Sequence, residues 1–181
     1  PRLIAAVAVW FAGALAWMAL PHHKGDFKPL PNEDAAMTAV RNLSIPPGVY
    51  FFPHMQDCGK MKTDPVLKEK FEKGPHGLLQ IWPPDRFGKM GRNMVLIFIV
   101  YIMVGVFVAY LASLAVPRGS EFMKVFQFAG AAAVMAYCFA GLPTDICFGK
   151  PLRNVLANLA DGVAYGLITG AIFAAMWPSA V

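Results

Sequence analysis

Charged side chains are scarce in this sequence, and long stretches have none. Asp, Glu, Lys and Arg make up 15% of the 181 residues, hydrophobic residues make up 57%, and the mean hydropathy is +0.49. A soluble domain of this length usually carries about 25% charged residues. The composition therefore argues against a soluble enzyme and predicts an integral membrane protein.

Sequence motifs for catalysis and nucleotide binding are also missing. The chain has no C-x-x-C-H haem motif, no H-E-x-x-H zinc motif, no P-loop and no G-x-S-x-G nucleophile elbow. Its net charge of +5 does not predict nucleic-acid binding, because the basic residues lie beside apolar runs, where lipid headgroups explain them. We expect no enzyme activity, no catalytic residue and no nucleic-acid partner.

Cysteines are too few for a disulfide framework, since the chain has only Cys58, Cys138 and Cys147. We expect Cys138 to be a small buried apolar residue within a span. Cys58 and Cys147 fall on the same side of the predicted membrane. They would pair in an oxidising compartment, but two unrelated free thiols are the favoured interpretation.

Long apolar runs are what the sequence does contain. Each is close to the length of a helix that crosses a ~30 Å hydrocarbon core. The first resembles a signal peptide, but it ends without a small-residue cleavage site, so a retained anchor is favoured. We predict an all-α membrane fold with four transmembrane helices and both chain ends on the same side. The four runs are residues 3–20, 94–116, 122–142 and 154–178.

The last run has a face almost without side chains. Interior glycines cost a soluble helix about 1 kcal/mol each relative to alanine, but in a bilayer a smooth face lets another helix come very close. A similar small-residue stripe runs along the second span. We therefore predict two helix-packing faces, Asn158, Gly162, Gly166, Gly170 and Ala174 on the last run, and Gly105, Ala109 and Ser113 on the second.

Residues 21–92 differ from the rest, with most of the charges and 10 of the 15 prolines. We predict a small α+β extramembrane segment there, between an anchor helix (1–20) and a three-helix transmembrane bundle (93–181). Two small helices and two short strands bury little apolar surface, so this segment should not be stable alone. The expected elements are helices over 33–42 and 64–73 and strands over 49–52 and 78–82.

Signals for membrane orientation conflict. Seven basic residues near the span ends lie on the side of the long segment and three lie on the other side, which favours a cytoplasmic segment. Arg2 before a short first run favours cytoplasmic termini instead, and the rule is weak for long loops. We expect a multi-pass protein of the bacterial inner membrane with residues 21–92 in the periplasm, and a cytoplasmic segment is the alternative.

One loop combines imidazole, thioether and thiol groups within eight residues. His54, Met55, Cys58 and Met61 are ligand types that Cu(I) accepts, and His22, His23 and His76 would add imidazoles from the same side. The spacing fits no metal signature, and Met55 and Met61 serve equally well as apolar contacts on the bilayer surface. We predict no cofactor, with copper at this loop as the alternative.

Asp161 is the one acidic residue inside the predicted spans. An intramembrane acid is by default a candidate functional site, here for a proton or another cation. Asp161 also lies less than two turns from the start of its helix, and no basic partner appears in the other spans. A structural role in capping or in a helix–helix hydrogen bond is therefore the favoured interpretation.

Three motifs in the long segment carry a resemblance. They are P-H-H-K-G-D-F-K-P-L-P-N-E-D, P-P-G-V-Y-F-F-P-H-M and G-P-H-G-L-L-Q-I-W-P-P, followed by three apolar spans. With them the chain resembles a group of small uncharacterised bacterial inner-membrane proteins with four predicted spans. The resemblance implies one membrane domain and carries over no activity and no site residue.

Two functions follow from these patterns. The favoured one is a non-catalytic accessory or structural subunit of a larger bacterial membrane complex, with respiratory and photosynthetic complexes as examples. Its partners would be lipid and other membrane proteins, bound through the small-residue faces. The alternative is a metal-handling or small-solute transport protein that uses the His54–Met61 loop or Asp161.

Overall fold

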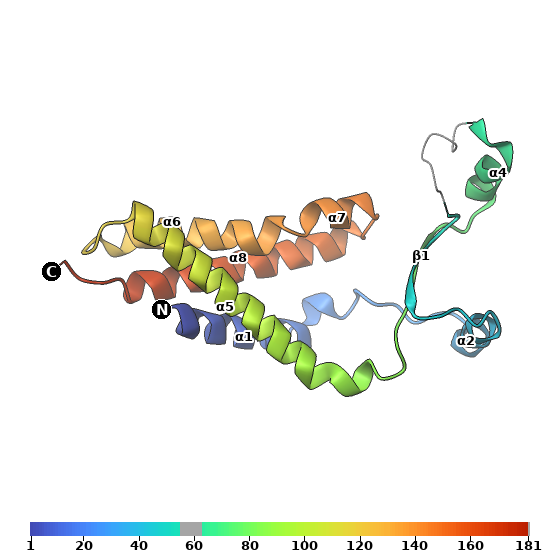
Figure 1. Ribbon diagram of the computed structural model, residues 1–181, viewed down its shortest axis with the longest axis horizontal. Helices are drawn as coiled ribbons and strands as arrows, with labels where there is room; N and C mark the ends of the chain where they lie inside the picture. Colours follow the sequence, from blue (N-terminus) through green and yellow to red (C-terminus); the bar gives the residue numbers. More distant parts are fainter. Residues whose placement is uncertain (55–62, 181) are drawn as a thin grey trace. The chain divides into compact units, whose positions relative to one another are not determined.

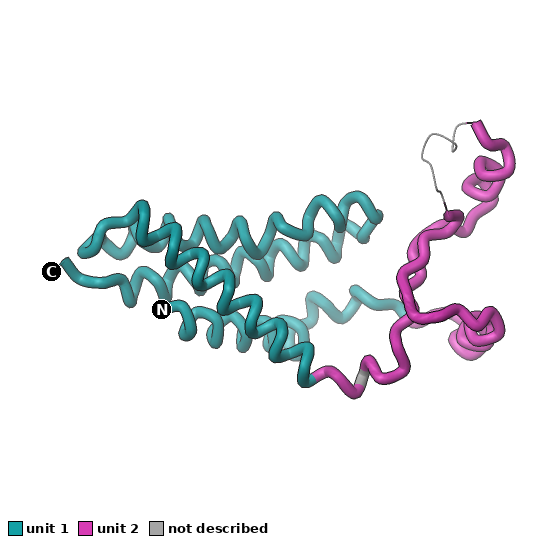
Figure 2. The backbone as a smooth tube through the Cα atoms, viewed as in Figure 1, with its two compact units in different colours: residues 1–28, 91–181 teal, residues 29–90 magenta. Residues whose placement is uncertain are grey.

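The computed structural model describes residues 1–54 and 63–180 of the chain. They form two compact units, one of residues 1–28 and 91–181 and one of residues 29–90 (Figure 2). Residues 21–28, which the sequence assigns to the extramembrane segment, pack with the helices, because their side chains bond to the last helix. This regrouping places two histidines beside the membrane helices.

The first unit consists of helices and short helical turns (Figure 1). In chain order they are α1 (Arg2–Met18), the 3₁₀ turn η1 (Pro21–His23), α5 (Met90–Ala115), α6 (Phe122–Val134), the π-helical turn η3 (Met135–Phe139), α7 (Leu142–Cys147) and α8 (Leu152–Ala175). Both chain ends lie at the same end of this unit (Figure 1).

Three helices of the described chain are long and apolar enough to cross a membrane: Met90–Ala115, Phe122–Cys147 and Leu152–Ala175. The first apolar run forms the 17-residue helix α1, which ends at Met18 rather than Leu20. Leu20 is extended because the ring of Pro21 disfavours helical geometry in the preceding residue. The fold is therefore multi-helical and compatible with several membrane crossings, and the count of four stays a prediction.

The predicted loop after the third run begins instead with a helix. α7 covers Leu142–Cys147, and Pro143 lies in its first turn. The N–H groups of a first turn have no partner within the helix, so the N–H that proline lacks is not needed there. Between α6 and α7 the chain passes through one π-helical turn, which carries Tyr137 and Cys138. Such turns occur frequently at functional sites.

At its glycines, α8 packs closely against the backbone of α6. A Cβ atom added at Gly166 would lie 2.8 Å from the Val134 nitrogen, and one added at Gly170 would lie 2.7 Å from the Gly130 Cα. Both distances are too short for a real carbon atom. The glycines of α8 therefore allow a backbone approach that no other residue type permits.

The remaining residues of this face lie along the same contact. A Cβ at Gly162 would lie 2.7 Å from the Cys138 sulfur of η3. Asn158 is half-buried near the start of the face, and Ala174 is buried at its end. The face predicted to pack against another helix thus packs against α6 and η3 of the same chain.

α5 turns a different face inward from the one predicted. Gly105 is buried, and a Cβ there would lie 3.2 Å from the Arg2 carbonyl oxygen of α1. The buried face continues through Val108 and Ala112, because a helix with 3.6 residues per turn alternates steps of three and four. Ala109 is half-buried, and Ser113 is exposed.

The second unit is a hairpin with two short helices. β1 (Gly48–Phe52) pairs with β2 (Gly77–Ile81) in antiparallel register. In the chain, α2 (Glu33–Asn42) precedes β1, and α4 (Pro65–Lys73) lies between the two strands. A further 3₁₀ turn, η2 (Phe87–Lys89), precedes α5. In α2 and α4, which are described throughout, no residue is fully buried.

Both helices of this unit begin at the side chains that the sequence indicates. The Asn32 side chain accepts a hydrogen bond from the Ala35 nitrogen at 3.2 Å, and Asp64 Oδ1 accepts from the Val66 and Leu67 nitrogens at 2.9 and 3.2 Å. These bonds satisfy donors that an uncapped helix leaves free.

Candidate cation site where the first helix meets the last

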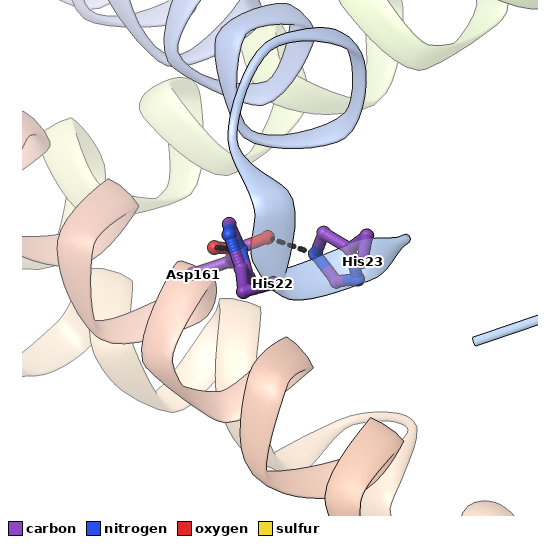
Figure 3. A group of neighbouring side chains, drawn as sticks. All are labelled: His22, His23 and Asp161. Carbon is purple, nitrogen blue, oxygen red and sulfur yellow. Dashed lines mark hydrogen bonds and ion pairs between the residues drawn. The ribbon is translucent and has the colours of Figure 1, made fainter. Parts of the chain in front are cut away.

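Two consecutive imidazoles follow α1 in the single turn η1. Because Leu20 is extended and Pro21 opens the turn, the chain bends sharply directly after α1. His22 and His23 then both reach Asp161 on α8 (Figure 3). The local sequence Leu-Pro-His-His therefore directs the two rings to one carboxylate.

Each oxygen of the Asp161 carboxylate meets one ring. His22 Nε2 lies 2.9 Å from Oδ1, and His23 Nε2 lies 2.8 Å from Oδ2. The side chains are 31%, 2% and 13% exposed for His22, His23 and Asp161. The cluster is thus closed around His23 and Asp161 and open beside His22.

The second ring nitrogen of His23 also faces a carboxylate. His23 Nδ1 lies 2.6 Å from Oδ2 of Asp26, whose side chain is 5% exposed. Burial lowers the pKa of His23, but its bonds to Asp161 and Asp26 outweigh that effect and raise the pKa above 6.5. The imidazole is therefore well placed to carry positive charge between two acids.

The first turn of α8 holds Asp26 in position. Arg153 Nη1 donates to Asp26 Oδ1 at 3.2 Å, Arg153 Nη2 donates to the His22 carbonyl at 3.0 Å, and Asn154 Nδ2 donates to the Asp26 carbonyl at 3.3 Å. A Cβ at Gly25 would lie 2.7 Å from Arg153 Nη1, so the glycine makes room for the guanidinium. Residues 22–26 and the start of α8 form one bonded assembly.

Aromatic stacking fixes the plane of the His23 ring. The Trp17 ring lies parallel to it, with 3.9 Å between the ring centroids and 6° between the planes. The His22 ring lies 4.3 Å away on a tilted plane. His23 is therefore oriented by two neighbouring rings as well as two carboxylates.

A polar stripe continues from Asp161 along α8. Tyr165 and Thr169 follow Asp161 at intervals of one turn, so the stripe extends about 12 Å along the helix. The Tyr165 hydroxyl is a polar neighbour of the Asp161 carboxylate. Tyr165 and Thr169 are both buried. We call Asp161, Tyr165 and Thr169 the polar stripe.

Two further tyrosines meet this stripe. Tyr101 of α5 and Tyr137 of η3 lie edge to face with Tyr165, at ring-centroid distances of 6.3 and 5.9 Å. A Cβ at Gly13 of α1 would lie 3.3 Å from the Tyr165 hydroxyl and 3.4 Å from the Tyr101 hydroxyl. Three helical elements, α5, η3 and α8, thus bring hydroxyl groups together inside the bundle, next to Gly13 of α1.

The Thr169 hydroxyl is fully buried with the Tyr137 hydroxyl as its polar neighbour, and it has no well-formed hydrogen bond to the residues that the structure describes. We expect Thr169→Val to keep or raise the stability of the protein in detergent, by up to about 1 kcal/mol, because it removes an unpaired polar group without changing shape. Thermal melts of both proteins measure this effect. Thr169→Ala, which leaves a void, is the control and should lower the melting temperature. An equal loss in the valine variant would contradict the prediction and indicate a bonded hydroxyl.

The loop singled out for copper lies mostly outside the described residues. His54 is exposed at the end of β1, whereas Met55, Cys58 and Met61 fall in the range that the structure does not describe. His76 is exposed in the second unit and lies near Phe71. The structure therefore gives no arrangement of that loop around a metal ion.

Two of the three cysteines lie in the described part of the chain. Cys138 is buried in η3, and its sulfur donates a weak hydrogen bond to the Leu159 carbonyl at 3.6 Å. Cys147 is a free, exposed thiol at the end of α7. Cys58 lies outside the described residues.

Sequence reasoning missed the partners of Asp161, because it searched for them in the other spans. The partners come from the segment after α1, 139 and 138 residues earlier in the chain. Three features of the sequence could have indicated this cluster. They are the histidine pair directly after the first apolar run, the acid three residues beyond His23, and the single acid in the last run.

Chemically, the cluster combines two imidazole nitrogens with one carboxylate, and a second carboxylate supports one of the rings. His22, His23 and Asp161 each present a ligand atom, and these atoms lie within 4.8 Å of one another. Such a group can hold a proton, or a metal ion in place of that proton, because an imidazole nitrogen must be deprotonated to bind a metal. No family model, curated protein or solved structure that we compared matches this chain.

Proposed function

We propose that this protein is a multi-pass membrane protein that takes up a cation at Asp161 and moves it along the polar stripe. The observation that supports this proposal best is the pairing of a carboxylate on an apolar helix with two imidazoles. Ionisable groups are expensive in a bilayer and usually mark ion or proton pathways.

The groups around the site favour a cation over an anion. Asp161 and Asp26 are acidic, and the tyrosine and threonine hydroxyls beneath them offer oxygen atoms. Arg153, a fixed positive charge beside the site, is already engaged by Asp26 and the His22 carbonyl. An anion would meet carboxylates first.

The polar stripe begins beside the partly exposed His22 and ends at apolar residues inside the protein. One turn beyond Thr169, α8 carries Phe173, which is fully buried in the apolar core with Val108 and Val125. A transporter needs a pathway that is closed on one side while it is open on the other. The half-buried His22 and the buried Phe173 fit such an arrangement.

An accessory subunit of a larger membrane complex is the second candidate function. The glycine face of α8 is occupied within the chain, so it does not favour a partner. α5 does favour a partner, because only 11% of its apolar span is buried inside the protein. A single monodisperse species after gentle extraction from native membranes would count against this candidate. The bacterial inner membrane and a periplasmic segment 21–92 stay predictions of the sequence.

We expect Asp161→Asn to reduce cation movement at least tenfold in sealed vesicles that contain the full chain. The substitution keeps the shape of the side chain and removes the charge that attracts the ion. Fluorescent indicators for protons, potassium, manganese and zinc inside the vesicles measure the movement.

Asp145→Asn is the matched control for this experiment. Asp145 lies in α7 and pairs with Lys150 at 2.8 Å, whereas the carboxylates that pair with the imidazoles are Asp161 and Asp26. It should leave the cation movement at the level of the unchanged protein. The proposal fails if the unchanged protein moves no cation faster than protein-free vesicles do, or if Asp161→Asn moves it equally fast.

A further inference from the structure

The geometry points to a binding site for a divalent transition-metal ion, built from His22 Nε2, His23 Nε2 and the Asp161 carboxylate (Figure 3). This inference rests on the proposed function, since it names the class of cation that the site takes. It places the metal between η1, directly after α1, and the third turn of α8, and not at the His54–Met61 loop.

The spacing of the three groups suits a common metal ion. Two ligand atoms of a tetrahedral metal ion, each about 2.1 Å from it, lie about 3.4 Å apart. The two imidazole nitrogens lie 2.9 and 2.8 Å from their carboxylate oxygens. The three ligand atoms all lie within 4.8 Å of one another, so one ion can bind all of them after small movements of the side chains.

A second layer of contacts supports one ligand in the manner of metal sites. The other ring N–H of a metal-binding histidine usually donates a hydrogen bond to a carboxylate, a backbone carbonyl or water. This bond fixes the ring orientation. His23 makes such a bond with Asp26 at 2.6 Å, and Arg153 holds the other Asp26 oxygen at 3.2 Å. Trp17 stacks on the same ring. A surface ion pair needs none of this support.

The ligand types define the class of metal. Imidazole nitrogen with carboxylate oxygen suits zinc, iron(II), cobalt, nickel and manganese. Calcium and magnesium prefer oxygen ligands alone, and Cu(I) prefers sulfur, which the cluster of His22, His23 and Asp161 does not offer. Three protein ligands leave coordination positions free, and the half-exposed His22 gives the ion a route in and out.

A structural ion pair between the histidines and Asp161 is the competing explanation. It would join the end of α1 to α8 without any metal. The two explanations differ in the metal content of the purified chain and in its response to Co²⁺, whose absorption spectrum reports its ligands.

The test uses the full chain purified in mild detergent and freed of metal. We expect the unchanged protein to bind about one Co²⁺ per chain and to lose it to Zn²⁺. His22→Gln and Asp161→Asn should each weaken the binding at least tenfold. His22 is chosen over His23 because it is more exposed and its replacement disturbs packing less. His76→Gln and His54→Ala are the controls and should bind Co²⁺ like the unchanged chain.

Three results would overturn the site: a folded chain that binds no Co²⁺, Zn²⁺ or Mn²⁺, unchanged binding in His22→Gln and Asp161→Asn, or loss of binding in His54→Ala. Failure of the proposed function looks different. If the chain binds Co²⁺ through His22 and Asp161 but the vesicles show no cation movement, the site stands and transport fails. If protons or potassium move without metal binding, transport stands and the metal site fails.

Discussion

Leucine in place of Gly166 should separate α6 from α8 and leave little correctly folded protein in the membrane. At this position even a single carbon atom would lie 2.8 Å from the Val134 backbone nitrogen. Backbone atoms cannot move aside as a flexible side chain does, so the two helices must move apart. Overpacking a close-packed interior by a few carbon atoms costs about 1–3 kcal/mol, and a backbone clash costs more.

The experiment compares yield and melting temperature in mild detergent for a graded pair, Gly166→Ala and Gly166→Leu. Gly91→Ala is the matched control, since Gly91 lies in α5 and nothing stands within 4 Å of an added Cβ. That control should melt at the same temperature or higher, because alanine favours helix over glycine by about 1 kcal/mol. If Gly166→Leu melts like the unchanged protein, the close contact between α6 and α8 is wrong.

Asp26→Asn should lower the affinity for Co²⁺ by about 10–100-fold while the capacity stays near one ion per chain, the range found when supporting residues of metal sites are replaced. Asp26 is not a ligand of the proposed metal ion but bonds to His23, so its role is to position that ligand. An amide has the same shape, but it loses the charge-assisted bonds to His23 and Arg153.

Titration of the metal-free protein with Co²⁺ separates affinity from capacity. The absorption spectrum of the bound ion should also change, because the His23 ring is no longer fixed. Asp145→Asn is again the control and should bind Co²⁺ like the unchanged chain. A variant that melts at a lower temperature but keeps its affinity and spectrum would mean that Asp26 supports only the fold.

Local sequence chemistry predicted the small helices and strands well. Asn32 and Asp64 cap α2 and α4 as expected, because capping depends only on residues within one turn. The strands also lie within one or two residues of the predicted runs. Pro53 follows β1 directly, and proline has no N–H to donate to the next bond of a strand ladder.

Features that depend on contact between distant segments were not predictable in the same way. The buried face of α5 follows its crossing with α1 at Gly105, and spacing alone could not choose between Ala109 and Val108. The π-helical turn at Tyr137 has no sequence signal of its own. It became visible only in the packed bundle.

The candidate site shows the same limit most clearly. Asp161 could be singled out, because an acid in an apolar run is conspicuous. His22 and His23 lie outside the runs, and only the turn after α1 brings them to α8. A search for partners limited to the spans therefore finds none.

The glycine face of α8 has a thermodynamic consequence as well as a steric one. Between membrane helices, water supplies no hydrophobic driving force, so small gains and losses decide whether two helices stay together. Glycine has no side-chain rotamers to freeze, so docking Gly162, Gly166 and Gly170 against α6 and η3 loses no side-chain entropy. The close packing of α8, the helix that carries Asp161, is thus reached at these three positions without ordering any side chain.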